Sequence, residues 1–470
     1  MEKKQRTKYI VFDTLSAALA WAALFLFRKL ALENTAFVDA ASIYQDSNLW
    51  LGMVAVPCGW LALYAIMGTY RNVLRKARLK ELLETVVATI IGVVVIFFLL
   101  LIDDDVATYR YYYSSFLFLL AAHFTLTYIP RLVITTRKVK RVHSRQIGFP
   151  SIIIGNGPKA MQTYLDLENQ ETYSGNIFVG YIRVHDTHPS SPLPMPCLGT
   201  PDDIPAIIQR HRIQEAIIAL DESDRHLING LLLHLVASSD IIIKITPDAR
   251  DLIVGSIHQQ SIFHSPLITI DNRLMPEWQY SVKRIFDIVA SLLAMLILSP
   301  VYLVTAIIIK ATSKGPVFYA QERIGYHGKP FKMHKFRSMY IDAEEAGPAL
   351  SKDNDPRITP FGRFMRKVRL DEIPQFYNVL RGTMSIVGPR PERQYYIDQI
   401  VKRAPEYLLL QRLKPGITSW GQVKYGYASS VDEMLERLRY DLLYLDNLSL
   451  STDLKIMLYT VIIIIQGRGK

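Results

Sequence analysis

The stretch Val86–Leu101, with the sequence VVATIIGVVVIFFLLL, contains no charged residue. It lies within an apolar segment from Leu82 to Ile102, close to the roughly 20 residues needed to cross about 30 Å of hydrocarbon. A helix buried in a soluble bundle would instead carry charged residues at helical spacing on its outer face. The stretch therefore predicts a membrane span.

Three similar apolar segments share the N-terminal part of the chain with it, at Tyr9–Phe27, Leu49–Gly68 and Tyr112–Ile134. Basic residues gather before the first span, between the second and third, and after the fourth: Lys3, Lys4, Arg6, Lys8; Arg71, Arg75, Lys76, Arg78, Lys80; Arg137, Lys138, Lys140, Arg141, Arg145. The loops after the first and third spans are mainly acidic. Arg28 and Lys29, directly after the first span, are exceptions to this pattern. The positive-inside rule predicts a four-helix bundle with both ends in the cytoplasm.

Composition narrows the class of protein further. The chain has 470 residues, enough for several domains, and a net charge of +11. Such a surplus marks either a nucleic-acid binder or contact with anionic lipids and phosphorylated substrates, and the apolar segments favour lipids over nucleic acid. Two cysteines, Cys58 and Cys197 in a Pro-rich loop, are too few for a disulfide framework or a metal cluster.

Two polar residues, Asp13 and His123, fall inside the predicted spans. Either they belong to a proton or ion path, or they make interhelical or interfacial polar contacts. Nothing in the sequence orders them into a relay, which favours the contacts.

A parallel α/β sheet is predicted after the bundle. Short apolar runs alternate with charged helical stretches, at Ser151–Ile154, Ile177–Ile182, Glu215–Leu220 and Ile241–Ile245. Gly155-Asn156-Gly157 follows the first run, where amides at a helix start can hold a phosphate, but Met161 stands where a third glycine is expected. The module either binds a nucleotide or is a degenerate regulatory or dimerising module.

A fifth apolar run, Ile285–Ile309, is flanked by basic residues at both ends and contains Ser299-Pro300 in its middle. Proline kinks a helix by removing an amide donor, and a serine hydroxyl can bond the freed backbone groups. We expect a re-entrant helix that bends at Ser299 and Pro300 and returns to the cytoplasmic side, with a kinked full span as the alternative. The final run, Leu454–Ile465, is too short to span and is expected either to pack against the protein or to lie at the interface.

Chemically versatile residues concentrate in the C-terminal part. The stretch Arg366-Lys367-Val368-Arg369-Leu370-Asp371-Glu372-Ile373-Pro374 sets two adjacent carboxylates beside three cations. Because proline is tolerated in the first turn of a helix, we expect Asp371 and Glu372 at a helix start, where the dipole favours anions. For this pair alone, a helix cap with a solvated partner is the simpler interpretation.

The region from Lys283 to Gly467 resembles the bacterial sugar transferase domain of the polyprenyl-phosphate hexose-1-phosphate transferases, the large monotopic phosphoglycosyltransferases. The matching motifs are Lys283-Arg284-Ile285-Phe286-Asp287, Ser299-Pro300, Lys335-Phe336-Arg337-Ser338-Met339, Asp355-Pro356-Arg357-Ile358-Thr359, Leu370-Asp371-Glu372-Ile373-Pro374-Gln375, Met384-Ser385-Ile386-Val387-Gly388-Pro389-Arg390-Pro391 and Lys414-Pro415-Gly416-Ile417-Thr418. One departure is Lys424-Tyr425-Gly426-Tyr427, where several members have Asn-Gly-Arg or Ser-Gly-Arg.

The resemblance implies transfer of a hexose-1-phosphate from a UDP-sugar to undecaprenyl phosphate, with release of UMP, as the first membrane step of exopolysaccharide, capsule or O-antigen synthesis. Asp371 would attack the sugar-bearing phosphorus and form a phosphosugar-aspartyl intermediate. Glu372 would bind Mg²⁺, the implied cofactor, or handle a proton. Phosphate contacts are expected first from Arg366 and Arg390, then from Lys335 and Arg337. Asp441 and Asp453 are further polar candidates.

Three parts are therefore expected in a bacterial inner-membrane protein: a four-helix transmembrane bundle over residues 1–145, a Rossmann-like α/β module over 146–270, and an α-rich catalytic domain over 271–470 on the cytoplasmic face, with the re-entrant helix at 285–309. The oligomeric state stays open, with a homodimer as one alternative.

A membrane-anchored nucleotide-sugar dehydratase or epimerase would need a complete dinucleotide fingerprint and a Tyr-x-x-x-Lys pair, and Ser151–Ile270 offers no convincing set. A scaffolding protein with a decayed transferase domain is opposed by the intact Asp371, Glu372 and Arg390.

Overall fold

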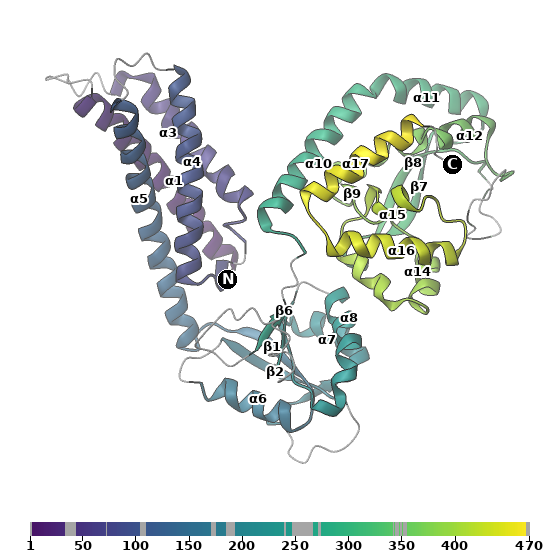
Figure 1. The fold of residues 1–470 in the computed structure, drawn as a ribbon, viewed down its shortest axis with the longest axis horizontal. Helices are drawn as coiled ribbons and strands as arrows, with labels where there is room; N and C mark the ends of the chain where they lie inside the picture. The colour runs from purple at the N-terminus through teal and green to yellow at the C-terminus, as the bar shows by residue number, and fades with distance from the viewer. Residues whose placement is uncertain are drawn as a thin grey trace. The chain divides into compact units, whose positions relative to one another are not determined.

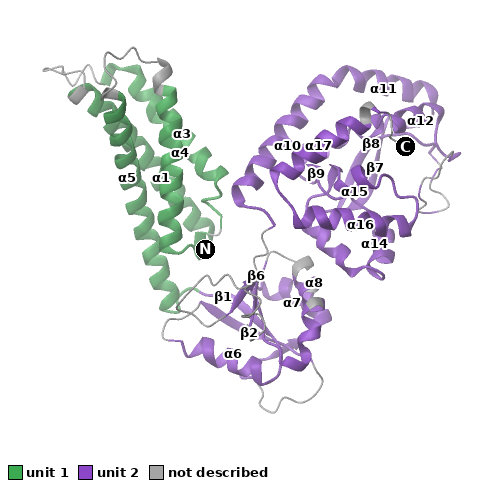
Figure 2. Cartoon of the chain, in the orientation of Figure 1, with its two compact units in different colours: residues 1–147 green, residues 148–470 purple. Residues whose placement is uncertain are grey.

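The chain forms two compact units, Met1–Ile147 and Gly148–Lys470 (Figure 1, Figure 2). The computed structural model describes residues 2–32, 44–71, 73–103, 110–170, 175–184, 193–238, 241–246, 267–270, 274–341, 343, 347, 350 and 355–466. The division between the units lies close to the expected end of the bundle at residue 145. The expected division near residue 270 stays a prediction inside the second unit.

Four long helices build the first unit. They are α1 (Glu2–Phe27), α3 (Ser47–Ile66), α4 (Arg78–Asp103) and α5 (Arg110–His143), with the short helices η1 (Arg28–Leu32) and η2 (Val73–Arg75) in the connections. Each long helix is long and apolar enough to cross a membrane. The predicted number and order of the spans are confirmed, as expected of a membrane protein.

The two polar residues noted in the spans make interhelical contacts. Arg131 of α5 donates two hydrogen bonds to the Asp13 carboxylate of α1, at 2.9 and 2.8 Å, and the Tyr70 hydroxyl donates a third at 2.9 Å. His123 Nε2 is hydrogen-bonded to the Tyr64 hydroxyl at 2.9 Å. A buried charge is tolerated only when it is paired and hydrogen-bonded, so these contacts fix how the helices pack.

The second unit begins with a six-stranded sheet in the order β3-β2-β1-β4-β5-β6. Its strands are β1 (Phe149–Ile154), β2 (Asn176–Ile182), β3 (Cys197–Gly199), β4 (Glu215–Ile218), β5 (Ile242–Ile245) and β6 (Ile268–Ile270). All neighbours pair in parallel except β5 and β6. The four predicted strands are confirmed. Cys197 begins the edge strand β3, so its placement in a loop was wrong.

Helices cover both faces of this sheet (Figure 1). Ile152 and Ile154 of β1 pack with α7 (Ile204–His211) and α8 (Ile228–Ser238), while Ile153 packs with α6 (Pro158–Glu168). Successive side chains of a strand point to opposite faces, which explains why a strand buried on both sides is an unbroken isoleucine run. Short helices η3 (Pro201–Asp203) and η4 (Glu222–Leu227) precede α7 and α8.

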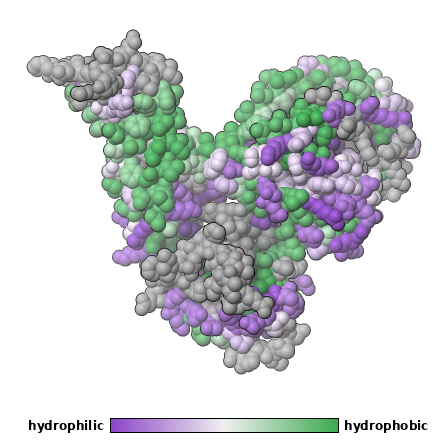
Figure 3. Space-filling model, viewed as in Figure 1, coloured by the Kyte–Doolittle hydropathy of each residue, from purple (hydrophilic) through white to green (hydrophobic). Residues whose placement is uncertain are grey.

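The fifth apolar run forms two helices, α10 (Glu277–Ile297) and α11 (Ser299–Thr312), bent by 59° at Leu298. Pro300 lies in the first turn of α11, and the Ser299 hydroxyl donates to the Leu296 carbonyl at 2.7 Å. The bend is therefore where the sequence predicted it. Large apolar side chains are exposed along both helices (Figure 3): Ile285, Phe286, Val289, Leu292, Leu293, Leu296, Ile297, Leu303, Val304 and Ile307.

Polar residues near the start of α10 fix this helix to the rest of the unit. Arg284 donates to the carbonyls of Val379 and Leu380, at 2.6 and 2.9 Å, and so binds the end of α13 (Gln375–Arg381). Asp287 accepts a hydrogen bond from Ile386 N at 3.0 Å, in β9 (Ser385–Val387). The Lys-Arg-Ile-Phe-Asp motif thus fastens α10 to α13 and β9.

The rest of the second unit contains two pairs of short strands and several helices. The antiparallel pair is β7 (Phe318–Ile324) and β8 (Pro330–Phe336), joined by η5 (Tyr326–Gly328), and the parallel pair is β9 and β10 (Gly416–Thr418). The helices are α12 (Pro360–Lys367), η6 (Leu370–Glu372), α14 (Gln394–Val401), η7 (Pro405–Arg412), α15 (Trp420–Lys424), α16 (Val431–Asp446) and α17 (Leu450–Ile465). Helix α8 of the sheet module lies against η7, and Leu409 of η7 packs on the hydrophobic core of the sheet module.

Candidate active site

Asp371 and Glu372 lie in the single 3₁₀ turn η6, between α12 and α13. Arg369, just before the turn, has a left-handed backbone with φ of 56°, which reverses the chain after α12. Pro374 is the N-cap residue of α13. The two carboxylates therefore lie at a helix start, as expected, in the first turn of a short 3₁₀ helix that directly precedes α13. Both side chains are largely buried.

Three cations face Glu372. Lys335 Nζ lies 3.1 Å from its Oε1, Arg390 Nη1 lies 3.5 Å from the same oxygen, and Arg369 Nη1 lies 3.7 Å from Oε2. Lys335 is also the cation near Asp371, at 4.0 Å from Oδ2. The structure thus brings together residues from β8, η6 and the segment after β9.

These surroundings act differently on the two carboxyl groups. Burial raises the pKa of Asp371 above its ordinary value, and Lys335 only partly offsets this effect. Burial also disfavours the charged form of Glu372, but Lys335, Arg390 and Arg369 outweigh it and lower its pKa to about 2. The negative charge of Glu372 is therefore balanced by the neighbouring cations. The charge of Asp371 is balanced less completely, so its carboxylate is the more basic of the two. That division suits a nucleophile beside an electrostatic partner.

Arg366 and Arg337 take different positions. Arg366 Nε donates to the Ser338 hydroxyl at 3.0 Å, and its charge acts on the Asp371 carboxylate, so it belongs to the cluster. Arg337 instead donates to the carbonyls of Lys314 and Ser313, at 2.7 and 2.9 Å. The structure does not bring Arg337 to the carboxylates.

Asp441 and Asp453 are buried in structural contacts. Asp441 accepts a hydrogen bond from Gly421 N at 2.9 Å, which joins α16 to α15, and burial raises its pKa. Asp453 accepts from the Tyr444 hydroxyl at 2.6 Å and pairs with Lys283 of α10. These carboxylates hold elements together and lie outside the described contacts of Asp371 and Glu372.

Two residues of the site were not predicted from the sequence. Tyr427, between α15 and α16, accepts a hydrogen bond from Arg390 Nη2 at 3.3 Å. Glu392, two residues after Arg390, pairs with Arg437 at 2.6 Å and Arg323 at 3.3 Å, which fixes the segment that carries Arg390. The motif that contains Tyr427 was noted only as a departure, because nothing local connects it to Arg390.

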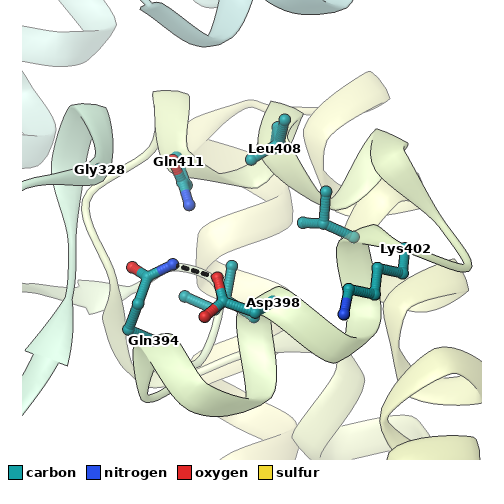
Figure 4. A pocket seen from close by; sticks show the side chains of 8 residues that line it. Gly328, Gln394, Asp398, Lys402, Leu408 and Gln411 are labelled. Carbon is teal, nitrogen blue, oxygen red and sulfur yellow. Dashed lines mark hydrogen bonds between the residues drawn. The ribbon is translucent and has the colours of Figure 1, made fainter.

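A pocket of about 560 Å³ opens elsewhere in the second unit (Figure 4). Its lining comes from η5, α14 and η7: Gly328, Gln394, Ile397, Asp398, Val401, Lys402, Leu408 and Gln411. Gln394 Nε2 donates to Asp398 Oδ1 at 2.6 Å, one turn along α14 (Figure 4). None of the candidate catalytic residues lines it, so the carboxylate cluster is a separate feature.

The carboxylates fit Mg²⁺ only as part of a site shared with substrate. Among the described residues, no three His, Cys, Asp or Glu side chains come together to hold a metal. Mg²⁺ is commonly bound by one or two carboxylates together with substrate phosphates and water. Glu372 Oε2 has its ion-pair partner, Arg369, at 3.7 Å, whereas Oε1 has two cations at 3.1 and 3.5 Å, so Oε2 is the less closely paired oxygen.

Comparison with known proteins gives two family matches. A family model described as bacterial sugar transferase matches residues 278–467 and contains the whole carboxylate and cation cluster. A second model, described as a CoA-binding domain, matches residues 65–246.

The start of α6 does not fit a bound coenzyme A phosphate. Lys159 N, in the first turn of α6, donates to Asp221 Oδ1 at 3.1 Å. The other oxygen of Asp221 lies so close to Gly157 that a side chain there would clash with it. The chain's own carboxylate therefore occupies the position in which helix amides bind phosphate. This observation favours the degenerate alternative for the module.

Characterised relatives extend the comparison. The UDP-N-acetylgalactosamine-undecaprenyl-phosphate N-acetylgalactosaminephosphotransferase of Aeromonas hydrophila is 41% identical over 42% of this chain and 47% of its own length. The UDP-glucose:undecaprenyl-phosphate glucose-1-phosphate transferase of Klebsiella pneumoniae is 36% identical over 53% of this chain and 54% of its own length. The chain thus spans about half the length of these two relatives. The undecaprenyl-phosphate galactose phosphotransferase of Salmonella typhimurium is 32% identical over 68% of both chains. Taken with the sugar transferase model, this last match shows that the chain belongs to the bacterial sugar transferase family.

Proposed function

We propose that this protein transfers a hexose-1-phosphate from a UDP-sugar to undecaprenyl phosphate and releases UMP, as the first membrane step in the synthesis of an exopolysaccharide, capsule or O-antigen. The observation that carries the proposal is the buried Asp371-Glu372 pair among Lys335, Arg390 and Arg366. A cluster of cations around adjacent carboxylates suits phosphoryl chemistry, because it attracts a diphosphate to a carboxylate that would otherwise repel it. The names of the relatives support both substrates.

In the first step, an Asp371 oxygen bonds to the sugar-bearing phosphorus of the UDP-sugar. The bond from that phosphorus to the bridging oxygen breaks, and UMP leaves with the electron pair. In the second step, a phosphate oxygen of the lipid attacks the same phosphorus, and the aspartyl oxygen leaves as a free carboxylate. Arg390, Lys335 and Arg366 bind phosphate oxygens and balance the charge that moves during both displacements.

Glu372 is the residue that would hold Mg²⁺ together with the donor diphosphate. Bound there, the metal supplies charge neutralisation on phosphate oxygens. Lys335 and Arg390 keep Glu372 ionised, since they lower its pKa to about 2 in spite of its burial.

We propose a membrane arrangement that suits a lipid acceptor. Helices α10 and α11 form a re-entrant hairpin in the cytoplasmic leaflet of the inner membrane. Support comes from the 59° bend, the exposed apolar side chains on both helices, and the basic residues at both ends, including Lys283 and Lys314. The mainly parallel sheet with helices on both faces supports a Rossmann-like module. We expect its role to be placement or dimerisation rather than chemistry.

The proposal is tested with the purified full chain in lipid nanodiscs that contain undecaprenyl phosphate. UMP release and lipid-linked sugar are measured across UDP-glucose, UDP-galactose and their N-acetyl forms, with and without Mg²⁺. We expect one preferred donor, equimolar products and loss of both products in Asp371→Asn. Absence of UMP and lipid product with every donor, from wild-type protein that is folded, would reject the function.

A further inference from the structure

Tyr427 lies against Arg390 through two contacts. The Arg390 Nη2 group donates to the Tyr427 hydroxyl at 3.3 Å, and the guanidinium carbon lies 5.0 Å from the centre of the tyrosine ring. Tyr427 belongs to the connection between α15 and α16, far along the chain from Arg390. A residue from a separate segment thus determines where this arginine can point.

The contacts restrict the guanidinium from two sides. Its Nη1 faces Glu372 Oε1 at 3.5 Å, while its Nη2 faces the tyrosine hydroxyl. An arginine has donors only and holds them in one plane, so two acceptors at different nitrogens fix the orientation of that plane. Stacking on an aromatic ring adds a further restraint.

Tyr427 is more exposed than the arginine that it contacts. The Arg390 side chain is 11% exposed, whereas Tyr427 as a residue is 37% exposed. The hydroxyl uses its oxygen as the acceptor from arginine, which leaves its own proton for another partner. A residue that served only to fill the core would be buried, as the neighbouring Ala428 is at 2% exposure.

The electrostatic surroundings agree with this geometry. Arg390 lowers the pKa of Tyr427, and Lys335 and Arg366 act in the same direction, against burial and the charge of Glu372. The tyrosine hydroxyl is therefore polarised by the same cations that surround the candidate nucleophile.

We propose that Tyr427 is a positioning residue for Arg390, which it holds so that the remaining N–H groups of the guanidinium meet the diphosphate of the donor. The inference rests on the proposed function for the identity of that donor. It adds a role for Tyr427, the last residue of the Lys424-Tyr425-Gly426-Tyr427 motif, to which the transfer mechanism assigns no function.

Two substitutions separate the hydroxyl from the ring. Tyr427→Phe removes the acceptor and keeps the ring, whereas Tyr427→Leu removes both. Because a hydrogen bond to a charged group is involved, we expect KM for the UDP-sugar to rise about tenfold in Tyr427→Phe and further in Tyr427→Leu, with a smaller change in kcat. Tyr425→Phe is the matched control, since Tyr425 is an exposed tyrosine of the same loop, and it should leave both constants unchanged.

A double-mutant cycle with Arg390→Lys tests whether the effect passes through Arg390. Lysine lacks the planar fork, so Tyr427→Phe should cost much less in that background than in wild type. Equal, additive losses in the two backgrounds would overturn the inference.

Binding of UDP to the full chain, measured by calorimetry, gives a readout that needs no turnover. We expect about tenfold weaker UDP binding by Tyr427→Phe, with an unchanged melting temperature. Weaker UDP binding in a protein that transfers no sugar would retain the role of Tyr427 and reject the proposed function. Equal UDP binding by wild type and Tyr427→Phe would overturn the role of Tyr427, whatever the transfer activity.

Discussion

Arg337 and Arg390 are two arginines of the second unit whose guanidinium groups have different partners. Arg337 binds the carbonyls of Ser313 and Lys314 and the Ser313 hydroxyl, and so fixes the chain that leaves α11. Arg390 faces Glu372 and Tyr427. Substitution of Arg337 should therefore lower the stability of the fold, and substitution of Arg390 should lower the rate of transfer.

We expect Arg337→Lys to lower the free energy of unfolding by about 2 kcal/mol, because lysine cannot bond both carbonyls in a fork. Its KM for the UDP-sugar should stay unchanged. Arg390→Lys should keep the melting temperature and lower kcat/KM by about tenfold or more. Thermal melting and UMP release of the two full-length variants check this, and the opposite pattern would contradict the assignments.

The sequence allowed part of this site to be predicted. Asp371 and Glu372 are adjacent, so their pairing needs no tertiary structure. Lys335 and Arg337 were both expected to bind phosphate, and only Lys335 lies at the carboxylates. Strand β8 ends at Phe336, so Arg337 follows the strand end and turns to the residues after α11 instead. Tyr427 meets Arg390 only through tertiary packing, for which the sequence carries no local signal.

Among the elements, the bent pair α10 and α11 was the most predictable. The cause is local, since Pro300 lacks an amide donor and Ser299 bonds the Leu296 carbonyl left at the break. Strands β3 and β6 were missed because each has three residues, too few for a clear pattern. Their pairing depends on the neighbouring strands β2 and β5.

The re-entrant hairpin predicts that both of its ends face the cytoplasm. We expect Ser281→Cys and Lys314→Cys, each made in a chain whose exposed Cys58 and Cys197 are replaced by serine, to react with an impermeant maleimide in inverted vesicles and not in spheroplasts. Labelling of one position from the periplasmic side alone would show a full span and contradict the hairpin.

The α/β module predicts no coenzyme A binding at the start of α6, because Asp221 already bonds Lys159 N there. We expect no calorimetric heat of binding with coenzyme A and no protection of the α6 amides from hydrogen exchange. UDP serves as the positive control for a competent preparation. Protection of the Lys159 amide by coenzyme A in the wild-type chain would contradict this account.

At the scale of the molecule, the candidate chemistry is confined to one part of the chain. Lys335, Arg366, Asp371, Glu372 and Arg390 all lie inside the sugar transferase match at 278–467. A protein that begins near Asp271, a residue outside the described ranges, should therefore retain some transfer activity in detergent. Its melting temperature should be lower than that of the full chain, since Leu409 of η7 loses its contact with the core of the sheet module. A folded fragment without any activity would show that the other parts contribute to the chemistry.

The central claim is that Asp371 forms a covalent bond to the phosphosugar. The most direct measurement incubates the full chain with a UDP-sugar labelled in the β-phosphate, without lipid acceptor, followed by rapid quenching and peptide analysis. We predict label on the peptide that contains Asp371, release of about one UMP per active site, and transfer of that label to undecaprenyl phosphate when it is added. Asp371→Asn should show no label and a turnover lower by on the order of a thousandfold or more. Transfer to lipid that proceeds without labelled protein, or near-normal turnover of Asp371→Asn, would contradict the covalent mechanism and require direct displacement by the lipid phosphate.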